Sequence, residues 1–249
     1  MFAVFLAGAA AGTINTVVGS GTLITFPTLL AFGVPPVTAN VSNTVGLVPG
    51  SLSGAVGYRR ELRGQRSRLV RLGSASLLGG IAGAVLLLAL PAAAFGAIVP
   101  VLIGTGCVLV IFQPAIGRRV AARHEAQGRA PEHGAAWVWC LVFLTGIYGG
   151  YFGAAQGVLL MAVMGIGIQE TMQRLNGTKN VLALLVNGVA AVVFIIVADV
   201  DWAVAGLIAL GAVIGGQLGA SVGRRLPPLV LRIFIVVVGV AAMTQFLLG

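Results

Sequence analysis

Two halves of this sequence carry the same residues at a fixed distance of 136 positions, as the separation of Gly157 from Gly21 illustrates (157 minus 21). The same distance separates four further pairs, which are Asn40 and Asn176, Gly80 and Gly216, Gly83 and Gly219, and Pro91 and Pro227. Self-similarity on this scale indicates a duplicated unit. In a very apolar chain it is typical of membrane transporters, in which two copies of a helical unit pack about a pseudo-axis and form one central site.

Composition restricts the fold to a membrane protein. Of 249 residues, 58% are apolar and only 8% are charged, which is too few charges for a water-soluble surface. The uncharged stretches 72–113 and 202–223 have room for hydrocarbon spans of ~20 residues each. We therefore predict an all-α polytopic membrane protein in contact with the lipid bilayer.

The distribution of charge predicts the orientation of the chain. The net charge is +9, but the arginines gather in short runs between apolar segments, so we expect no nucleic-acid partner. By the positive-inside rule, the basic loops 58–71, 114–135 and 223–228 are predicted to be cytoplasmic in a multi-pass protein of the plasma or inner membrane. The connection 197–202 carries only Asp199 and Asp201 and is predicted to lie outside. Since it aligns with the basic loop 58–71 after the shift, we predict that the two repeats are inverted.

Two apolar limbs, 22–32 and 158–168, are too short to cross ~30 Å of hydrocarbon at ~1.5 Å per residue. We predict that they return within glycine-broken hairpins, residues 1–33 and 137–168, whose tips meet near the midplane. Each half then has about four to five membrane segments. The other spans are predicted at 37–57, 72–90, 95–113, 177–197, 203–222 and 228–248, which gives a first repeat at 1–113, a cytoplasmic linker at 114–135 and a second repeat at 136–249.

The hairpin tips are the first candidates for a binding site. They contribute four consecutive residues of the first half and two of the second, namely Gly19, Ser20, Gly21, Thr22, Gln156 and Gly157. Irregular backbone at membrane depth is tolerated only where it lines a cavity or is buried in protein. Each tip begins a new helix, so its free N–H groups and the positive end of the helix dipole favour an anion.

Two polar clusters at equivalent positions are the second candidates: Asn40, Ser42, Asn43 and Thr44 in the first half, and Asn176, Thr178, Lys179 and Asn180 in the second. Helix capping and hydrogen bonds between helices would explain the amides and hydroxyls without a ligand. Lys179 has two interpretations, because its ammonium could reach the cytoplasmic surface or face the transport pathway and attract an oxyanion. Arg174 and Glu170 are spaced for a surface ion pair on one helix.

The missing residue types exclude other functions. No predicted span has Asp or Glu in its interior, so a proton relay through carboxylates and a divalent-metal site both lack ligands. No set of nucleophile and base lies at membrane depth, so we predict neither an enzyme nor a cofactor. Cys107 and Cys140 stand in apolar stretches and are interpreted as packing residues.

The order of these motifs resembles the TauE/SafE sulfite exporter family. The resemblance rests on the duplication, the glycine-broken first helix, Pro27, the stretch from Ala39 to Asn43, and the sequence N-G-T-K-N at Asn176–Asn180. It covers nearly the whole chain. What it implies is a plasma-membrane transporter of small sulfur-containing anions such as sulfite, sulfoacetate or thiosulfate.

Our leading hypothesis is therefore a secondary carrier that binds a small anion between the hairpin tips and works by alternating access. An anion-permeable channel, a carrier for a small organic anion without sulfur, and a membrane scaffold remain alternatives. The sequence leaves open whether sodium or a proton is the coupling ion, and whether the chain forms a homo-oligomer. Sodium could be held by backbone carbonyls together with Asn15, Ser42 or Asn43.

Overall fold

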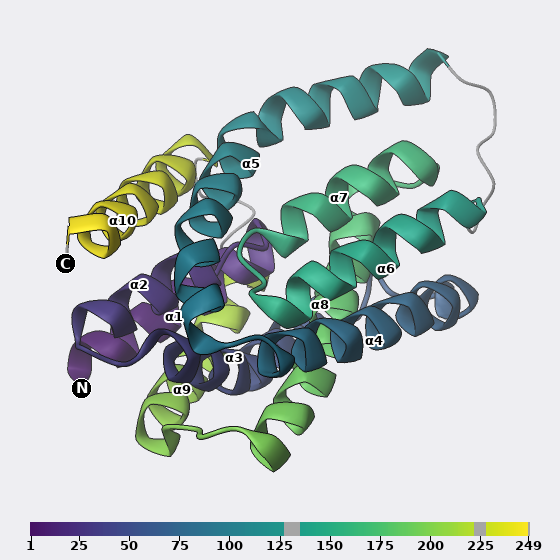
Figure 1. Ribbon diagram of the computed structural model, residues 1–249. Coiled ribbons are helices and arrows are strands. Elements are labelled where there is room, and N and C mark those ends of the chain that lie inside the picture. Colours follow the sequence, from purple (N-terminus) through teal and green to yellow (C-terminus); the bar gives the residue numbers. More distant parts are fainter. Residues whose placement is uncertain (127–134, 222–227, 249) are drawn as a thin grey trace.

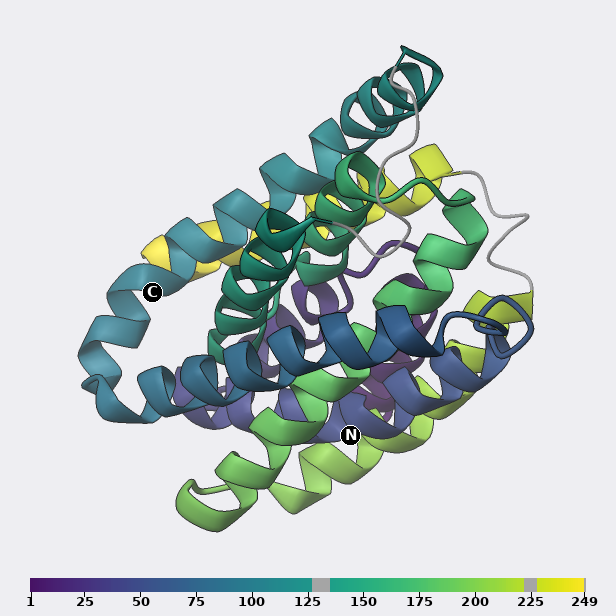
Figure 2. The same cartoon turned by 90° about the vertical axis from the view of Figure 1, so that its right-hand side faces the viewer.

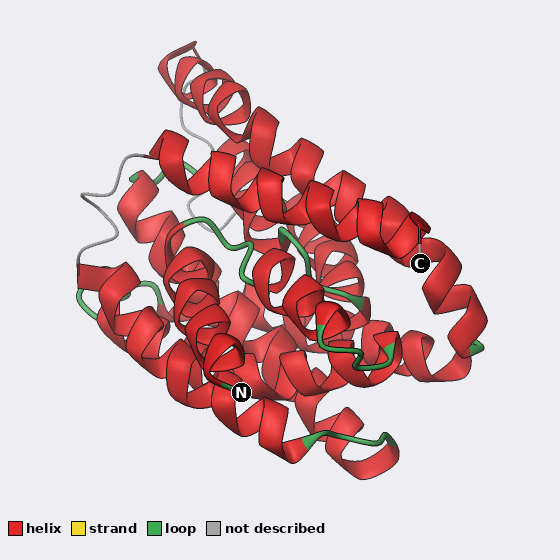
Figure 3. Cartoon of the chain, turned by 90° about the vertical axis from the view of Figure 1, so that its left-hand side faces the viewer, coloured by secondary structure: helices red, strands yellow, loops and turns green. Residues whose placement is uncertain are grey.

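The computed structural model describes residues 1–126, 135–221 and 228–248, and all regular secondary structure in these ranges is α-helical (Figure 3). The first half forms α1 (Phe2–Val17), α2 (Thr22–Ala31), α3 (Pro36–Gly57), α4 (Arg66–Ala89) and α5 (Ala92–Ala126). The second half forms α6 (Ala136–Tyr151), α7 (Gln156–Gly167), α8 (Met172–Val197), α9 (Trp202–Ser221) and α10 (Pro228–Leu248). The prediction of an all-α fold is confirmed.

Helix lengths follow the predicted membrane pattern. Among the described residues, four of the six predicted long spans are long and apolar enough to cross a bilayer, namely Arg66–Ala89, Ala92–Ala115, Met172–Val197 and Trp202–Ser221. The span predicted at 37–57 forms a helix of 22 residues but is not among these four. The four limbs α1, α2, α6 and α7 are apolar but have only 10 to 16 residues. Both glycine-broken hairpins therefore form at the predicted places, each from two short helices joined at a break.

Some helices extend beyond the spans predicted from hydropathy. The span predicted at 72–90 belongs to a helix that begins at Arg66, and the span predicted at 177–197 begins at Met172. The helix α5 continues past residue 113 into the predicted linker, as far as Ala126. Arginine and glutamine are good helix formers, so charge limits how deep a residue lies in a membrane but does not end the helix. The linker residues 127–134 and the loop at 222–227 lie outside the described residues.

The helix α5 changes direction along its length (Figure 1). Pro100 and Pro114 lie inside it. A proline removes one backbone hydrogen bond and its ring crowds the preceding turn, which bends a helix. The last helix, α10, packs against α5 and α2 at the edge of the bundle.

The contacts between helices repeat when the two halves are exchanged. The helix α1 packs on α9 just as α6 packs on α4, and α3 packs on α9 as α8 packs on α4. The helices α5 and α7 touch, as do α10 and α2, while α3 and α8 contact each other across the centre. Figure 2 shows the long helices α4 and α8 crossing in this interleaved bundle. The helices of each half thus pack mainly against helices of the other half. The inverted orientation of the two halves across a bilayer stays a prediction.

Glycine faces allow these helices to approach closely. A Cβ atom added to Gly215 of α9 would lie 2.0 Å from the carbonyl oxygen of Ala9 in α1. At the equivalent Gly79 of α4, a Cβ atom would lie 2.3 Å from the carbonyl oxygen of Phe143 in α6. Both distances are far below van der Waals contact, so the backbones touch where only hydrogen can fit. In lipid, such close packing is a main source of helix association.

We expect Gly215→Ala to lower the melting temperature of the purified protein, because overpacking a closely packed contact costs about 1–3 kcal/mol. The matched control is Gly206→Ala in the same helix, where an added Cβ atom has nothing within 4 Å. This control gains helix propensity of up to ~1 kcal/mol and should melt at the same or a higher temperature. Equal effects of the two substitutions would show that the α1–α9 contact is not the cause.

Candidate functional site

The two hairpins break in the same way at Gly19 and Gly153. Both residues have a positive φ, +87° and +79°, which glycine adopts without strain. The N–H of Gly19 donates to the carbonyl of Ile14 at 3.0 Å, and the N–H of Gly153 donates to that of Tyr148 at 3.1 Å. These glycines are 134 positions apart (153 minus 19). The two hairpins therefore superimpose with an offset of 134 residues, whereas the later helices repeat with an offset of 136.

The tips of the two hairpins are in direct contact. The N–H of Gly157 donates to the carbonyl oxygen of Gly19 at 3.0 Å. A Cβ atom on Gly19 would lie 2.3 Å from the Cα of Gly157, and one on Gly157 would lie 2.4 Å from the Cα of Gly19. The sequence predicted that both tips offer free N–H groups, but in this closed arrangement Gly157 gives its N–H to the other tip.

Lys179 is completely buried beside this contact, with 0% of its surface exposed. Its Nζ atom donates to the carbonyl oxygens of Asn15 and Thr16, at 3.0 Å each. These carbonyls belong to the last turn of α1, where the helix dipole is negative and favours a cation. The interpretation in which Lys179 reaches the surface is wrong. Among the described residues, no carboxylate lies within 4.0 Å of its ammonium group.

Two asparagines converge on the same helix end. The Nδ2 atoms of Asn176 and Asn180 each donate to the carbonyl of Thr16 at 3.3 Å. Thr16 therefore faces donors from two amides and one ammonium, although a carbonyl oxygen has only two lone pairs. Donors to the Thr16 carbonyl thus outnumber its lone pairs, while the Oδ1 atom of Asn176 is a buried acceptor without a hydrogen-bond partner in the described structure.

The corresponding end of α6 has a simpler cap. Asn40 of α3 donates from Nδ2 to the carbonyl of Tyr151 at 2.9 Å, in the same role that Asn176 has on α1. The residue equivalent to Lys179 is Asn43, which accepts a hydrogen bond from Thr25 and donates to Thr22 at 3.3 Å. The two halves thus share the capping amide, and only the second half adds a cation.

Other predicted site residues serve the packing of helices. Ser42 accepts a hydrogen bond from the N–H of Asp201 at 2.9 Å, and Thr178 donates to Oε1 of Gln65 at 3.0 Å. Gly21 packs on α1, because an added Cβ atom would lie 2.6 Å from the carbonyl of Ala11. Of the residues considered for sodium, Asn43 and Ser42 have engaged side-chain oxygens, and the Asn15 carbonyl holds Lys179.

Two buried side chains at the tips have polar atoms without a partner in the described structure. The Oγ atom of Ser20, a residue with 0% exposure, stands next to Gly19, and the Nε2 atom of Gln156, with 3% exposure, stands next to Gly157. Buried polar atoms are usually hydrogen-bonded, so such exceptions mark candidates for ligand contact. The two atoms flank the tip contact in sequence, one from each hairpin.

The sequence analysis missed three buried polar residues of the predicted basic loop, Tyr58, Gln65 and Arg68. Tyr58 accepts a hydrogen bond from Nδ2 of Asn176 at 2.8 Å. Arg68 lies 3.3 Å from Oε2 of Glu170, which is also 3.0 Å from Arg174, so the predicted pair of Arg174 and Glu170 is confirmed and has a third member. A neutral glutamine within a run of arginines was the signal that could have revealed Gln65.

Glu170 is held in its charged form by these neighbours. Burial alone would raise the pKa of its carboxyl group, but hydrogen bonds from the N–H of Thr171 and from Arg174 and Arg68, together with the charge of Arg174, leave the pKa below its usual value. The ion cluster therefore persists at mildly acidic pH, and it weakens only when the pH falls towards that lowered value.

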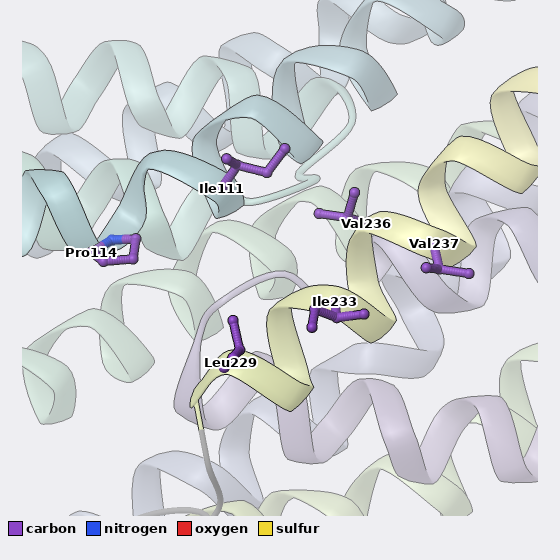
Figure 4. A pocket seen from close by; sticks show the side chains of 6 residues that line it. All are labelled: Ile111, Pro114, Leu229, Ile233, Val236 and Val237. Carbon is purple, nitrogen blue, oxygen red and sulfur yellow. The ribbon is translucent and has the colours of Figure 1, made fainter.

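Two grooves on the molecule lie away from the tips. One of about 330 Å³ lies between α5 and α10 (Figure 4) and is lined by Ile111, Pro114, Leu229, Ile233, Val236 and Val237. A second of about 690 Å³ lies on α3, α4 and α8 and is also lined by aliphatic side chains and a glycine. An oxyanion would lose its hydration there without gaining hydrogen bonds. The tips are therefore the better candidate for an anion site.

Comparison with known proteins gives the family. The model of the family "Sulfite exporter TauE/SafE" matches residues 4–246. A probable membrane transporter protein, ORF9 of Sinorhizobium sp, is 26% identical over 98% of this chain and 90% of its own length. The probable membrane transporter protein YfcA of Escherichia coli K12 is 24% identical over 98% of this chain and 88% of its own. No solved structure matches.

The match covers both hairpins, both polar clusters and all four long apolar spans. It agrees with the resemblance carried by the repeat and by the motif at Asn176–Asn180. The protein is thus a membrane transporter, and the chain belongs to the sulfite exporter TauE/SafE family.

Proposed function

We propose that this protein is a secondary carrier in the plasma or inner membrane for small sulfur-containing oxyanions, the class of sulfite, sulfoacetate and thiosulfate. The observation that carries the proposal is the completely buried ammonium of Lys179 at the meeting of the two hairpins. A buried charge is costly unless an opposite charge accompanies it. Because the partners of Lys179 are neutral carbonyls, an anion beside it would supply that charge.

The surrounding groups favour an anion over a cation. Four of the six acidic residues are described in full, and they stand at connections between helices: Glu61, Glu170, Asp199 and Asp201. The tips instead offer donors, namely the third N–H of Lys179, the amide of Gln156 and the hydroxyl of Ser20. Oxygen atoms of a small oxyanion accept such hydrogen bonds, and charge-assisted ones are the strongest.

The closed tip contact suggests how binding is coupled to opening. In the closed arrangement, the N–H of Gly157 and the ammonium of Lys179 are satisfied by the carbonyls at the end of the first hairpin. An anion takes over these donors and competes with the carbonyls of Gly19, Asn15 and Thr16. Binding then loosens the tip contact. Because the helix contacts repeat when the two halves are exchanged, the molecule has two related ways to open, one towards each side of the membrane, as alternating access requires.

We predict that Lys179→Asn folds but loses sulfite binding. This variant places in the second half the residue that the first half has at the equivalent position 43. Loss of charge-assisted hydrogen bonds worth about 1.5–3 kcal/mol should weaken binding ~10- to 100-fold. Sulfite should raise the melting temperature of the wild type and not of the variant, and flux of labelled sulfite into proteoliposomes should fall accordingly. Unchanged flux with normal expression would remove Lys179 from the site.

We predict that Gly19→Ala abolishes transport, because the added methyl group must adopt a left-handed backbone and collides with the Cα of Gly157. The matched control is Gly33→Ala, which carries the same backbone strain at φ +79° but has nothing within 4 Å of the added atom. The strain is of order 1–3 kcal/mol in both, so only the tip contact differs. Equal loss of flux in both variants would contradict a role for this contact.

We predict that the loop at Arg63 and the connection at Asp199 lie on opposite sides of the membrane. Single cysteines at these two positions, in a background without Cys107 and Cys140, should react with an impermeant thiol reagent from opposite faces of oriented vesicles. Arg63 should react from the cytoplasmic face, in agreement with the positive-inside rule. Reaction of both from the same face would contradict the inverted repeat.

A further inference from the structure

An ion cluster joins the two halves on the side of the loop 58–65. Glu170, in the connection between α7 and α8, lies 3.0 Å from Arg174 of its own half and 3.3 Å from Arg68 of the other half. The side chains of Arg68 and Glu170 are 5% and 19% exposed, so water screens this contact far less than a surface pair. Arg174 also donates to the carbonyl of Arg63 at 3.1 Å.

Gln65 connects this cluster to the anion site. Its amide donates to the carbonyl of Arg174 at 3.2 Å, and its Oε1 accepts hydrogen bonds from Arg68 and from Thr178 at 3.0 Å. Thr178 directly precedes Lys179 in α8. The loop of the first half is thus bonded to the same turn of α8 that carries the buried ammonium.

The corresponding place at the other end of the molecule also joins the two halves by a hydrogen bond, but among the described residues it holds one carboxylate, that of Asp201, and no arginine. Ser42 and Asp201 are the equivalents of Thr178 and Gln65, each 136 positions away, and they are hydrogen-bonded at 2.9 Å. The equivalents of Arg68, Glu170 and Arg174 are Val204, Val34 and Thr38. The carboxylate of Asp201 accepts from the N–H of Val204 at 3.0 Å and caps α9.

We propose that the cluster of Arg68, Glu170 and Arg174 is a gate that closes the anion site on the side of the loop 58–65 and breaks when that side opens. The proposal rests on the carrier function proposed above. Opening this side moves the connection between α7 and α8 away from the start of α4, which separates Glu170 from Arg68. Among the described residues the equivalent positions of the opposite side form no ion pair, so the two openings of the cycle differ in energy, and removing the cluster shifts the population towards opening on its own side.

The test measures accessibility without any substrate. A single cysteine is introduced as Ser20→Cys, at a position with 0% exposure, in a background without Cys107 and Cys140. Its reaction with an impermeant, charged thiol reagent is followed from each face of oriented vesicles. The gate side is identified separately as the face from which a cysteine at Arg63 reacts.

Glu170→Gln should speed labelling of this cysteine roughly tenfold from the gate side and leave the rate from the other side unchanged or lower. Arg68→Gln should have a similar effect, and the double variant should add little, since both substitutions break the same contact. Asp199→Asn removes an exposed carboxylate at the opposite connection and should change neither rate.

An unchanged rate in Glu170→Gln, or an equal rise from both faces, would overturn the gate. If Glu170→Gln does not fold, Arg174→Gln removes the more exposed arm, 33% accessible, and is judged by the same criteria. These outcomes are independent of the function proposed above, because labelling needs no transported anion. Loss of the Lys179 effect on sulfite flux would refute the carrier and leave the labelling result intact.

Discussion

The rest of the structure depends on how the ends of two broken helices are satisfied. A helix that stops inside a membrane leaves carbonyl and N–H groups without water to bond. Here each end is completed by the other half of the repeat: Asn40 bonds the end of α6, and Asn176, Asn180 and Lys179 bond the end of α1. The hydrogen bond from Gly157 to Gly19 joins the two tips themselves. Neither half can form its hairpin in isolation without exposing these groups.

The duplicated halves have diverged at one decisive position. Asn43 and Lys179 are equivalent in sequence, but Asn43 ties α3 to the start of α2, whereas Lys179 brings a charge to the centre. A fully symmetric chain would have only neutral amides there. The ion cluster around Glu170 adds a second asymmetry, in the connection that leads into α8, nine residues before Lys179 (179 minus 170). In the carrier that we propose, selectivity for anions and the difference between the two gates would both derive from departures from symmetry.

Much of the fold could be predicted from the sequence, because the bilayer permits few structures. Apolar length predicted the long spans, and the short limbs 22–32 and 158–168 required hairpins. The contacts between the halves could not be predicted. The offset changes from 136 to 134 at the tips, and the bonds that tie Gln65 and Arg68 to the second half reach residues more than a hundred positions away. Several polar residues near the tips, such as Ser42 and Thr178, bond neighbouring helices, a role that local sequence could not separate from ligand binding.

The central claim is that an oxyanion binds between the hairpin tips beside Lys179. Its most direct test is a crystal structure of the protein grown with selenite, a heavier analogue of sulfite whose selenium is located by anomalous scattering. The account predicts a single strong selenium peak within hydrogen-bonding distance of Lys179 Nζ, close to Ser20 and Gln156. Peaks confined to the exposed arginines of the loop 58–65, with none at the tips, would contradict it.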